Sequence, residues 1–263
     1  MGLVLVTGAT GEVGRLVVPH LRQKFPLRLL SRRPQPGSEW VAADLTCLDD
    51  RLLRAMEGVD CVLNLAIATG HTGVYEDDAF NAERFRVNVY GTYALFEAAR
   101  CRGVRRVVHC SSLMVLWGYG KPEPGKLVPG DAPPKPAGTY ALTKALSEQV
   151  AQYFAETAGM EVLVIRTAAP LVPDDPRWRE IPVPPQRVPV VDLARAFELA
   201  VTCPLDGFAV VTIVGESSKR MWDLEPARRV LGYEPSVRLD DLGLRLGDPF
   251  VVPEAESDQQ AGP

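Results

Sequence analysis

Tyr140 and Lys144 are the residues of this 263-residue chain whose types and spacing point most directly to catalysis. They stand four positions apart at the start of a predicted long helix, so both side chains project from one face. A tyrosine with a pKa of about 10 is a poor base at neutral pH, but a neighbouring ammonium favours the phenolate and lowers that pKa. Tyr140 could then exchange a proton with a substrate hydroxyl or carbonyl while a hydride moves to or from a nicotinamide.

Ser112 is the third candidate catalytic residue. It ends a predicted strand, at the carboxyl edge where doubly wound sheets bind ligands, and its hydroxyl could hold the reacting oxygen. A Tyr-x-x-x-Lys pair alone is common in helices, and the alternative is a half-exposed structural tyrosine. The order of loop and helix, and the Ser111-Ser112 strand end, favour the catalytic interpretation.

A glycine-rich segment, TGATGEVG, directly follows the first predicted strand and opens a helix. Such a turn needs glycine for its backbone angles and for close approach of a pyrophosphate, and the helix N-terminus offers that anion free N–H groups. The spacing is GxxGxxG, and the alternative is a turn whose glycines serve geometry only. We predict a dinucleotide site that includes Gly8, Thr10, Gly11, Glu12, Val13 and Gly14.

The end of the second predicted strand bears on which dinucleotide binds. An acidic residue there would accept hydrogen bonds from the ribose hydroxyl of NAD, whereas this chain has Ser31, Arg32 and Arg33 and no carboxylate before Glu39. Arginine and a hydroxyl suit a 2′-phosphate, so we predict NADP in preference to NAD. NAD stays open, because arginines are common on the surface after a strand.

Short apolar runs alternate with helical patterns, which predicts an α/β fold with a Rossmann-type doubly wound parallel sheet. The expected strands are 3–6, 27–30, 40–43, 61–65, 106–110, 162–165 and 209–214, and the expected helices are 12–24, 49–56, 78–102, 140–158, 191–203 and 223–231. Residues 1–170 would form the dinucleotide-binding core. Prolines crowd between 171 and 189, where we expect irregular structure. Residues 171–253 would form a small substrate-capping region interleaved with the last sheet elements, and 254–263 a disordered tail.

Composition excludes several partners. The net charge of −4 gives no reason to expect nucleic acid or an anionic membrane, and no apolar run approaches the roughly 20 residues that span a bilayer. The five cysteines are scattered without CxxC pairing, which suits reduced thiols in the cytoplasm and no metal site.

With these motifs in view, the chain resembles the extended short-chain dehydrogenases, the NAD-dependent epimerase/dehydratase family, from about residue 3 to 235. The shared segments are TGATGEVG, VDCVLNLA, NVYGT, VVHCSSLMV, YALTK, VPVVDLARA and LGYEP. The resemblance places Asn88 in the proton-relay region, although this asparagine could equally cap or bridge locally. It also implies further cofactor-binding positions at Asp44, Leu45, Leu65, Ala66, Ile67, Lys144 and Arg166.

Within that family, uronate dehydrogenases and their relatives share the stretch 111–119, the Trp222-Asp223 pair and a final LGY segment. This similarity implies substrate contacts from Ser111, Leu113 and Tyr140. It also implies an arginine that binds a carboxylate, for which Arg177 or Arg179 is the candidate, the alternative being a solvated loop arginine. The Ser31-Arg32-Arg33 segment departs from the acidic NAD signature of these enzymes.

These features predict an NAD(P)-dependent oxidoreductase that transfers a hydride between nicotinamide and a hydroxyl/carbonyl pair of a small, sugar-like or other carbonyl substrate. One alternative is a sugar epimerase or dehydratase, in which the cofactor is reduced and reoxidised in place. Another is a dinucleotide-sensing regulatory protein without catalysis. By resemblance, the predicted helices 78–102 and 140–158 could pair across a homodimer interface.

Overall fold

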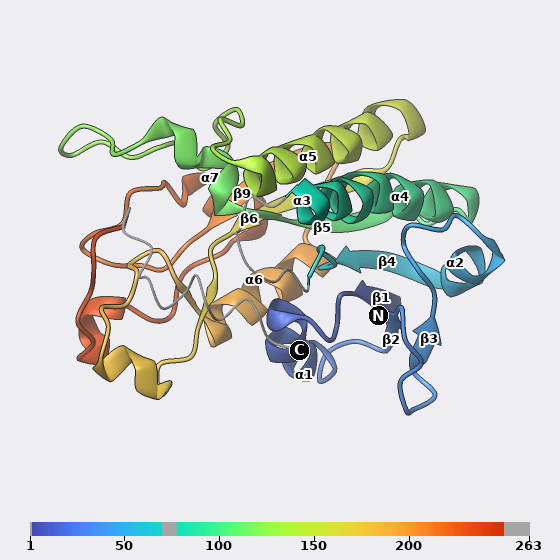
Figure 1. The fold of residues 1–263 in the computed structure, drawn as a ribbon, viewed down its shortest axis with the longest axis horizontal. Helices are drawn as coiled ribbons and strands as arrows, with labels where there is room; N and C mark the ends of the chain where they lie inside the picture. The colour runs from blue at the N-terminus through green and yellow to red at the C-terminus, as the bar shows by residue number, and fades with distance from the viewer. Residues whose placement is uncertain (1, 70–77, 250–263) are drawn as a thin grey trace.

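The structure, a computed structural model, describes residues 2–69 and 78–249. Its main sheet has seven parallel strands: β1 (Leu3–Thr7), β2 (Leu27–Ser31), β3 (Trp40–Ala42), β4 (Val59–Asn64), β5 (Arg106–Ser112), β6 (Glu161–Thr167) and β9 (Phe208–Ile213). Their order is β3-β2-β1-β4-β5-β6-β9 (Figure 1). The direction of strand addition reverses between β1 and β4, the switch point at which doubly wound sheets bind ligands. The predicted Rossmann-type fold class is confirmed.

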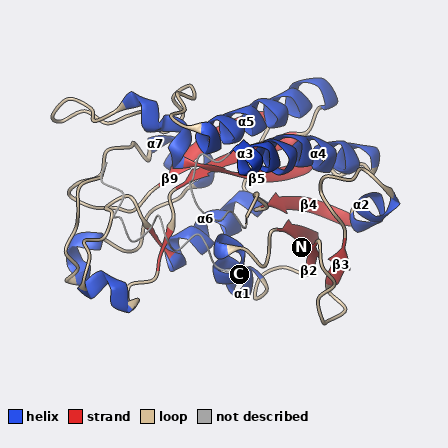
Figure 2. Ribbon diagram, in the orientation of Figure 1, coloured by secondary structure: helices blue, strands red, loops and turns tan. Residues whose placement is uncertain are grey.

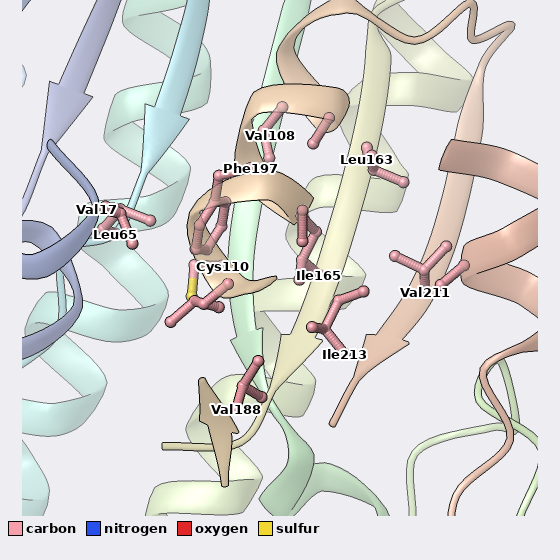
Figure 3. Close-up of a cluster of buried hydrophobic side chains, with 14 of the residues drawn as sticks. Val17, Leu65, Val108, Cys110, Leu163, Ile165, Val188, Phe197, Val211 and Ile213 are labelled. Carbon is pink, nitrogen blue, oxygen red and sulfur yellow. The ribbon is translucent and has the colours of Figure 1, made fainter. Parts of the chain in front are cut away.

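Helices cover both faces of this sheet (Figure 2). On one face lie α1 (Glu12–Leu21) and α6 (Val190–Thr202), and on the other α4 (Gly91–Cys101) and α5 (Thr139–Ala158). Successive residues of a strand point to opposite faces of the sheet. Because most residues of these strands are apolar, both faces of the sheet are apolar. Val6 belongs to the cluster under α1 and α6, and its neighbour Leu5 to the cluster under α4 and α5. Figure 3 shows Phe197 of α6 over Cys110 and other residues of the first cluster.

The remaining elements lie around this core: α2 (Asp50–Ala55), α3 (Asp78–Arg84), η1 (Phe85–Tyr90), η2 (Leu113–Tyr119), η3 (Pro176–Arg179), α7 (Glu225–Leu231) and η4 (Leu239–Leu242). In the described residues, no helix combines the length and the apolar character needed to cross a membrane.

The helix predicted from 78 to 102 is interrupted, which corrects the sequence-based expectation. A π-helical segment, η1, separates α3 from α4. A π turn inserts an extra residue and leaves backbone groups to be satisfied otherwise. Here the hydroxyl of Thr92 donates to the carbonyl oxygen of Asn88 at 2.7 Å. The predicted ends of the other elements differ from the observed ones by a few residues, and β5 extends to Ser112.

The proline-rich segment 171–189 is more ordered than expected. Two short strands, β7 (Pro170–Leu171) and β8 (Val188–Pro189), pair in parallel at its ends. Trp178 of η3 is 3% exposed and packs with Leu171, Val183 and Leu239. Prolines therefore shape a packed segment here. The predicted tail, 254–263, and the last residues of the predicted capping region, 250–253, lie outside the described residues.

Candidate active site

The glycine turn between β1 and α1 is fixed by close backbone packing. Gly8 has a φ of 65°, a left-handed conformation that favours glycine. A Cβ atom on Gly8 would lie 2.6 Å from the Leu65 carbonyl carbon, and one on Gly14 would lie 2.2 Å from the Gly8 carbonyl oxygen. The turn is closed by a hydrogen bond of 2.9 Å from the Gly11 N–H to the Gly8 carbonyl. No larger residue fits at positions 8 and 14.

This turn fits the pyrophosphate of a dinucleotide. Gly11 is the N-cap of α1, and no side chain of the described residues caps that N-terminus. The Arg15 N–H donates to the Gly11 carbonyl, so the N–H groups of Glu12, Val13 and Gly14 precede this helical hydrogen bond and could donate to an anion at the helix end. Thr10 and Gly11 lie in the same turn, at the carboxyl edge of β1.

The loop that follows β4 lies at the same carboxyl edge of the sheet as the glycine turn. The Ala66 N–H donates to the hydroxyl of Thr7 at 3.3 Å, which ties this loop to the strand before the glycine turn. Leu65 is buried, whereas the side chain of Ile67 is 40% exposed. Of these predicted cofactor contacts, Ile67 presents the most free apolar surface.

The predicted adenine end is exposed and rich in ion pairs. Arg32 and Arg33 follow β2 at the surface, and the hydroxyl of Ser31 accepts from the Arg33 N–H at 3.3 Å. Glu83 of α3 approaches this end: its carboxylate lies 3.8 Å from Arg32 and makes two hydrogen bonds, of 2.7 and 2.9 Å, with Arg86. Sequence reasoning missed this carboxylate because α3 is distant in the chain.

Asp44 and Leu45, two further predicted cofactor-binding residues, lie near this end. The Asp44 carboxylate accepts from the N–H and the hydroxyl of Thr46, both at 2.8 Å. Burial raises the pKa of Asp44, but these hydrogen bonds and the charges of Arg86 and Arg32 outweigh burial and lower it. Asp44 therefore carries its charge at neutral pH, and Leu45 is buried beside it.

The predicted catalytic residues lie on β5 and α5, two elements that contact each other. Lys144 is 1% exposed, and its ammonium donates to the Cys110 carbonyl at 2.5 Å. Cys110 precedes Ser112 by two residues on β5, so this contact brings α5 against the strand end that carries Ser112. Tyr140 is half-buried and lies one turn before Lys144. Burial lowers the pKa of Lys144, since desolvation penalises its charged form.

Asn88, on the π-helical segment, is drawn into the same region. Its amide oxygen accepts from the Ala68 N–H at 2.8 Å, and its amide nitrogen donates to the Thr143 hydroxyl at 3.0 Å. Thr143 in turn donates to the Tyr140 carbonyl at 2.8 Å. Asn88 thus connects the loop after β4 to the first turn of α5, which is compatible with both the relay and the bridging interpretations.

Ser111 and Arg166 have buried partners within the chain. The hydroxyl of Ser111 donates to Glu148 of α5 at 2.5 Å, and Arg166 of β6 makes a two-pronged ion pair with the same carboxylate at 2.7 and 2.9 Å. Arg166 also donates to the Ala132 carbonyl at 2.6 Å. Both residues lie under α5, and Arg166 also anchors the loop that precedes this helix.

Leu113 and Arg177, the other two predicted substrate contacts, also have partners within the chain. Leu113 is 2% exposed and belongs to the core cluster under α1 and α6. Arg177, on η3, lies 3.1 Å from the Asp175 carboxylate and stacks over the ring of Trp178 at 4.3 Å. The contact with Asp175 is made by Nε of Arg177, and the binding of a substrate carboxylate by this guanidinium stays a prediction.

The chain is similar in sequence to known proteins. The sequence model of the NAD dependent epimerase/dehydratase family matches residues 4–179. An L-arabinose 1-dehydrogenase (NAD(P)(+)) of Haloferax volcanii is 28% identical over 256 residues, which cover 89% of this chain and 96% of that protein. A uronate dehydrogenase of Pseudomonas syringae pv. tomato is 28% identical over 88% of this chain and 81% of its own.

Solved structures extend the likeness to ligand-bound proteins. A structure of MoeE5 in complex with UDP-glucuronic acid and NAD superimposes with a TM-score of 0.74 at 27% identity, over 93% of this chain and 97% of that chain. The likeness in fold therefore extends over most of the chain, as the likeness in sequence does.

Proposed function

The chain belongs to the NAD-dependent epimerase/dehydratase family, and from that premise we propose a specific activity for the site at the carboxyl edge of its sheet. The protein is an NAD(P)-dependent oxidoreductase, as the similarity to dehydrogenases along nearly its whole length supports. We propose that it acts on the hydroxyl or carbonyl group of a small sugar or sugar acid that carries no nucleotide. The observation that carries the proposed chemistry is the anchoring of Lys144 to the Cys110 carbonyl, beside Ser112 and one turn from Tyr140.

In this mechanism the bound nicotinamide supplies or accepts the hydride. Ser112 holds the reacting oxygen of the substrate by a hydrogen bond. Tyr140 exchanges the proton of that oxygen, and the buried ammonium of Lys144 stabilises the phenolate form of Tyr140. Gly8, Gly11 and Gly14 let the backbone approach the pyrophosphate, and Ala66 and Ile67 form an apolar wall beside the cofactor.

The direct test is an assay of nicotinamide absorbance with purified protein. NADP or NAD is combined with aldoses and sugar acids, and NADPH or NADH with aldehydes and keto compounds. Steady net change of the reduced cofactor supports the proposed dehydrogenase. Tight cofactor binding with no turnover on any substrate would instead favour a dinucleotide-sensing protein.

The second candidate function acts on a nucleotide sugar. Without net oxidation or reduction of the substrate, this activity would be that of an epimerase or dehydratase. The structure that favours it is MoeE5, which holds UDP-glucuronic acid within a chain of nearly the same extent. The same assay with UDP-sugars, followed by chromatography of the products, separates the two candidates. An altered sugar without net cofactor reduction would identify the epimerase or dehydratase.

For the cofactor, we propose NADP over NAD. The support is the pair Arg32 and Arg33 at the end of β2, both exposed and able to reach a 2′-phosphate. Glu83 works against this preference, because its carboxylate shares the surface with Arg32. The relative named for NAD(P)(+) is in keeping with a site that accepts both forms.

We also propose that residues 171–249 cap the substrate and that two copies of the chain pair through α4 and α5. Tyr90 at the end of η1, Tyr93 of α4 and Tyr153 of α5 are 47%, 42% and 55% exposed, and exposed aromatic surface of this kind supports a contact with a second copy. Sedimentation at several concentrations tests the pairing, and a monomer throughout would reject it. A cytoplasmic location remains our expectation, supported by five free thiols.

A further inference from the structure

A row of polar side chains crosses the apolar sheet beneath α4 and α5. Thr7 of β1 is in register with Asn64 of β4, and Asn64 with His109 of β5. Residues in register on parallel strands point to the same face, here the face covered by α5. All three side chains are at most 1% exposed. Buried polar groups at matching positions on three strands need partners, and they find one another.

The row continues from the sheet into the helix. The Thr7 hydroxyl donates to the Asn64 amide oxygen at 2.7 Å, and the Asn64 amide nitrogen lies 3.0 Å from Nδ1 of His109. Nε2 of His109 lies 2.9 Å from the hydroxyl of Ser147 on α5. That hydroxyl lies 2.7 Å from the Lys144 carbonyl and donates to it.

With the amide of Asn64 and the hydroxyl of Ser147 oriented as in the structure, these hydrogen bonds set the tautomer of His109. The hydroxyl of Ser147 donates its only hydrogen to the Lys144 carbonyl. It must therefore accept from His109, so Nε2 of His109 carries a hydrogen. The Asn64 amide nitrogen is a donor, because its amide oxygen accepts from Thr7, so Nδ1 of His109 must accept and carries none. His109 is therefore neutral. Burial and the nearby charge of Lys144 hold its pKa well below the ordinary value, in agreement with the same state.

From this geometry we infer that His109 is a positioning residue, which holds the glycine turn and the lysine-bearing helix in fixed relation through its Nε2–H tautomer. One end of the chain of hydrogen bonds is Thr7, which precedes Gly8 and accepts from the Ala66 N–H. The other end is the backbone of Lys144. The inference rests on the proposed roles of Lys144 and the glycine turn. In it, Nδ1 of the neutral imidazole accepts from Asn64 and Nε2 donates to Ser147.

The two nitrogens can be tested separately by substitution. In His109→Asn the amide oxygen can replace Nδ1 as the acceptor for Asn64, but nothing reaches Ser147. In His109→Gln the longer amide can replace the Nε2 donor to Ser147, while Asn64 loses its partner. His109→Phe removes both. Thr212→Val is the matched control, because it deletes a buried hydrogen bond, 2.6 Å to the Gly130 carbonyl, outside this row.

We expect a split between cofactor affinity and turnover. His109→Gln should weaken NADP and NAD binding, measured by calorimetry, by about tenfold, the equivalent of one hydrogen bond, with kcat largely kept. His109→Asn should lower kcat by a similar factor with the dissociation constants kept, and His109→Phe should show both losses. Equal losses in all three variants, or the same losses in Thr212→Val, would show a purely structural role and overturn the inference.

A spectroscopic measurement keeps the test independent of the substrate and of variant folding. Nitrogen-15 NMR of the wild-type imidazoles reports the tautomer, and His109 is assigned by the signal lost in His109→Gln. The inference requires a neutral Nε2–H form down to mildly acidic pH. An Nδ1–H or doubly protonated ring would overturn it. If no substrate were turned over, the proposed function would fail, while the tautomer and the calorimetric split would still decide the role of His109.

Discussion

The nicotinamide end and the adenine end of the proposed cofactor site are built in opposite ways. At the first, Lys144 is 1% exposed and anchored to a strand carbonyl. At the second, the side chains of Arg32 and Arg86 are 54% and 48% exposed and share the carboxylate of Glu83. Buried charges keep one geometry because any other leaves them unpaired, whereas exposed pairs are screened and exchange partners at little cost. We infer that the buried contacts fix the geometry of the catalytic residues, whereas the exposed ion pairs only weakly determine the selectivity between NADP and NAD.

The largest effect is expected at the buried end. Tyr140→Phe removes the proton-exchanging hydroxyl and should lower kcat by about 10²- to 10⁴-fold, the usual contribution of general acid–base catalysis. The dissociation constants of NADP and NAD should be unchanged, since the ring remains. Tyr153→Phe, a change of the same kind at a 55%-exposed position of α5, is the control. Residual turnover near the wild-type value would remove Tyr140 from the mechanism.

The buried ion pair under α5 comes next. Glu148→Gln leaves the guanidinium of Arg166 buried without its counter-charge, which should reduce the free energy of unfolding by about 3 to 5 kcal/mol. Denaturation in urea measures this loss. Glu123→Gln breaks an exposed pair with Lys126, with side chains more than two-thirds exposed, and should change stability by less than about 0.5 kcal/mol. Similar losses in both variants would contradict the contrast between buried and exposed charge.

The buried and exposed ends also differ in what the sequence could predict. The glycine turn is local in sequence, so its position and its need for glycine could be predicted from eight consecutive residues. The alternation of strands and helices predicted that Ser112 ends a strand and that Tyr140 and Lys144 lie at the start of a helix. The structural use of Arg166 could not be predicted, because its partners Glu148 and Ala132 come from separate segments.

Two further features depend on information that a sequence pattern does not hold. The hydrogen bonds among Thr7, Asn64 and His109 require the strand order and register, although a polar residue interrupting each apolar strand was a visible signal. The π-helical turn around Asn88 adds a residue without breaking the apolar pattern, so one continuous helix was the natural prediction. Side-chain placement at the adenine end depended on α3, which approaches β2 only in the folded chain.

At the adenine end, removing the arginines should shift selectivity. Arg32→Ala combined with Arg33→Ala deletes the groups proposed to bind the 2′-phosphate and should weaken NADP binding by about 10- to 100-fold, as for lost charge-assisted hydrogen bonds. NAD binding should change little. Calorimetric titration with both cofactors measures the ratio. Equal weakening of the two would refute the proposed NADP preference and assign the arginines to a shared part of the cofactor.

The smallest effect, in the opposite direction, is expected from Glu83. Its carboxylate competes with a 2′-phosphate for Arg32 and makes a two-pronged contact with Arg86. Glu83→Gln should therefore raise the affinity for NADP relative to NAD by about two- to fivefold, the range of an exposed ion pair. The gain should shrink as salt screens the charges, and Glu123→Gln should show none of it. A loss of NAD affinity instead would mean that Glu83 itself binds the ribose hydroxyls, so that α3 supplies the carboxylate that the end of β2 lacks.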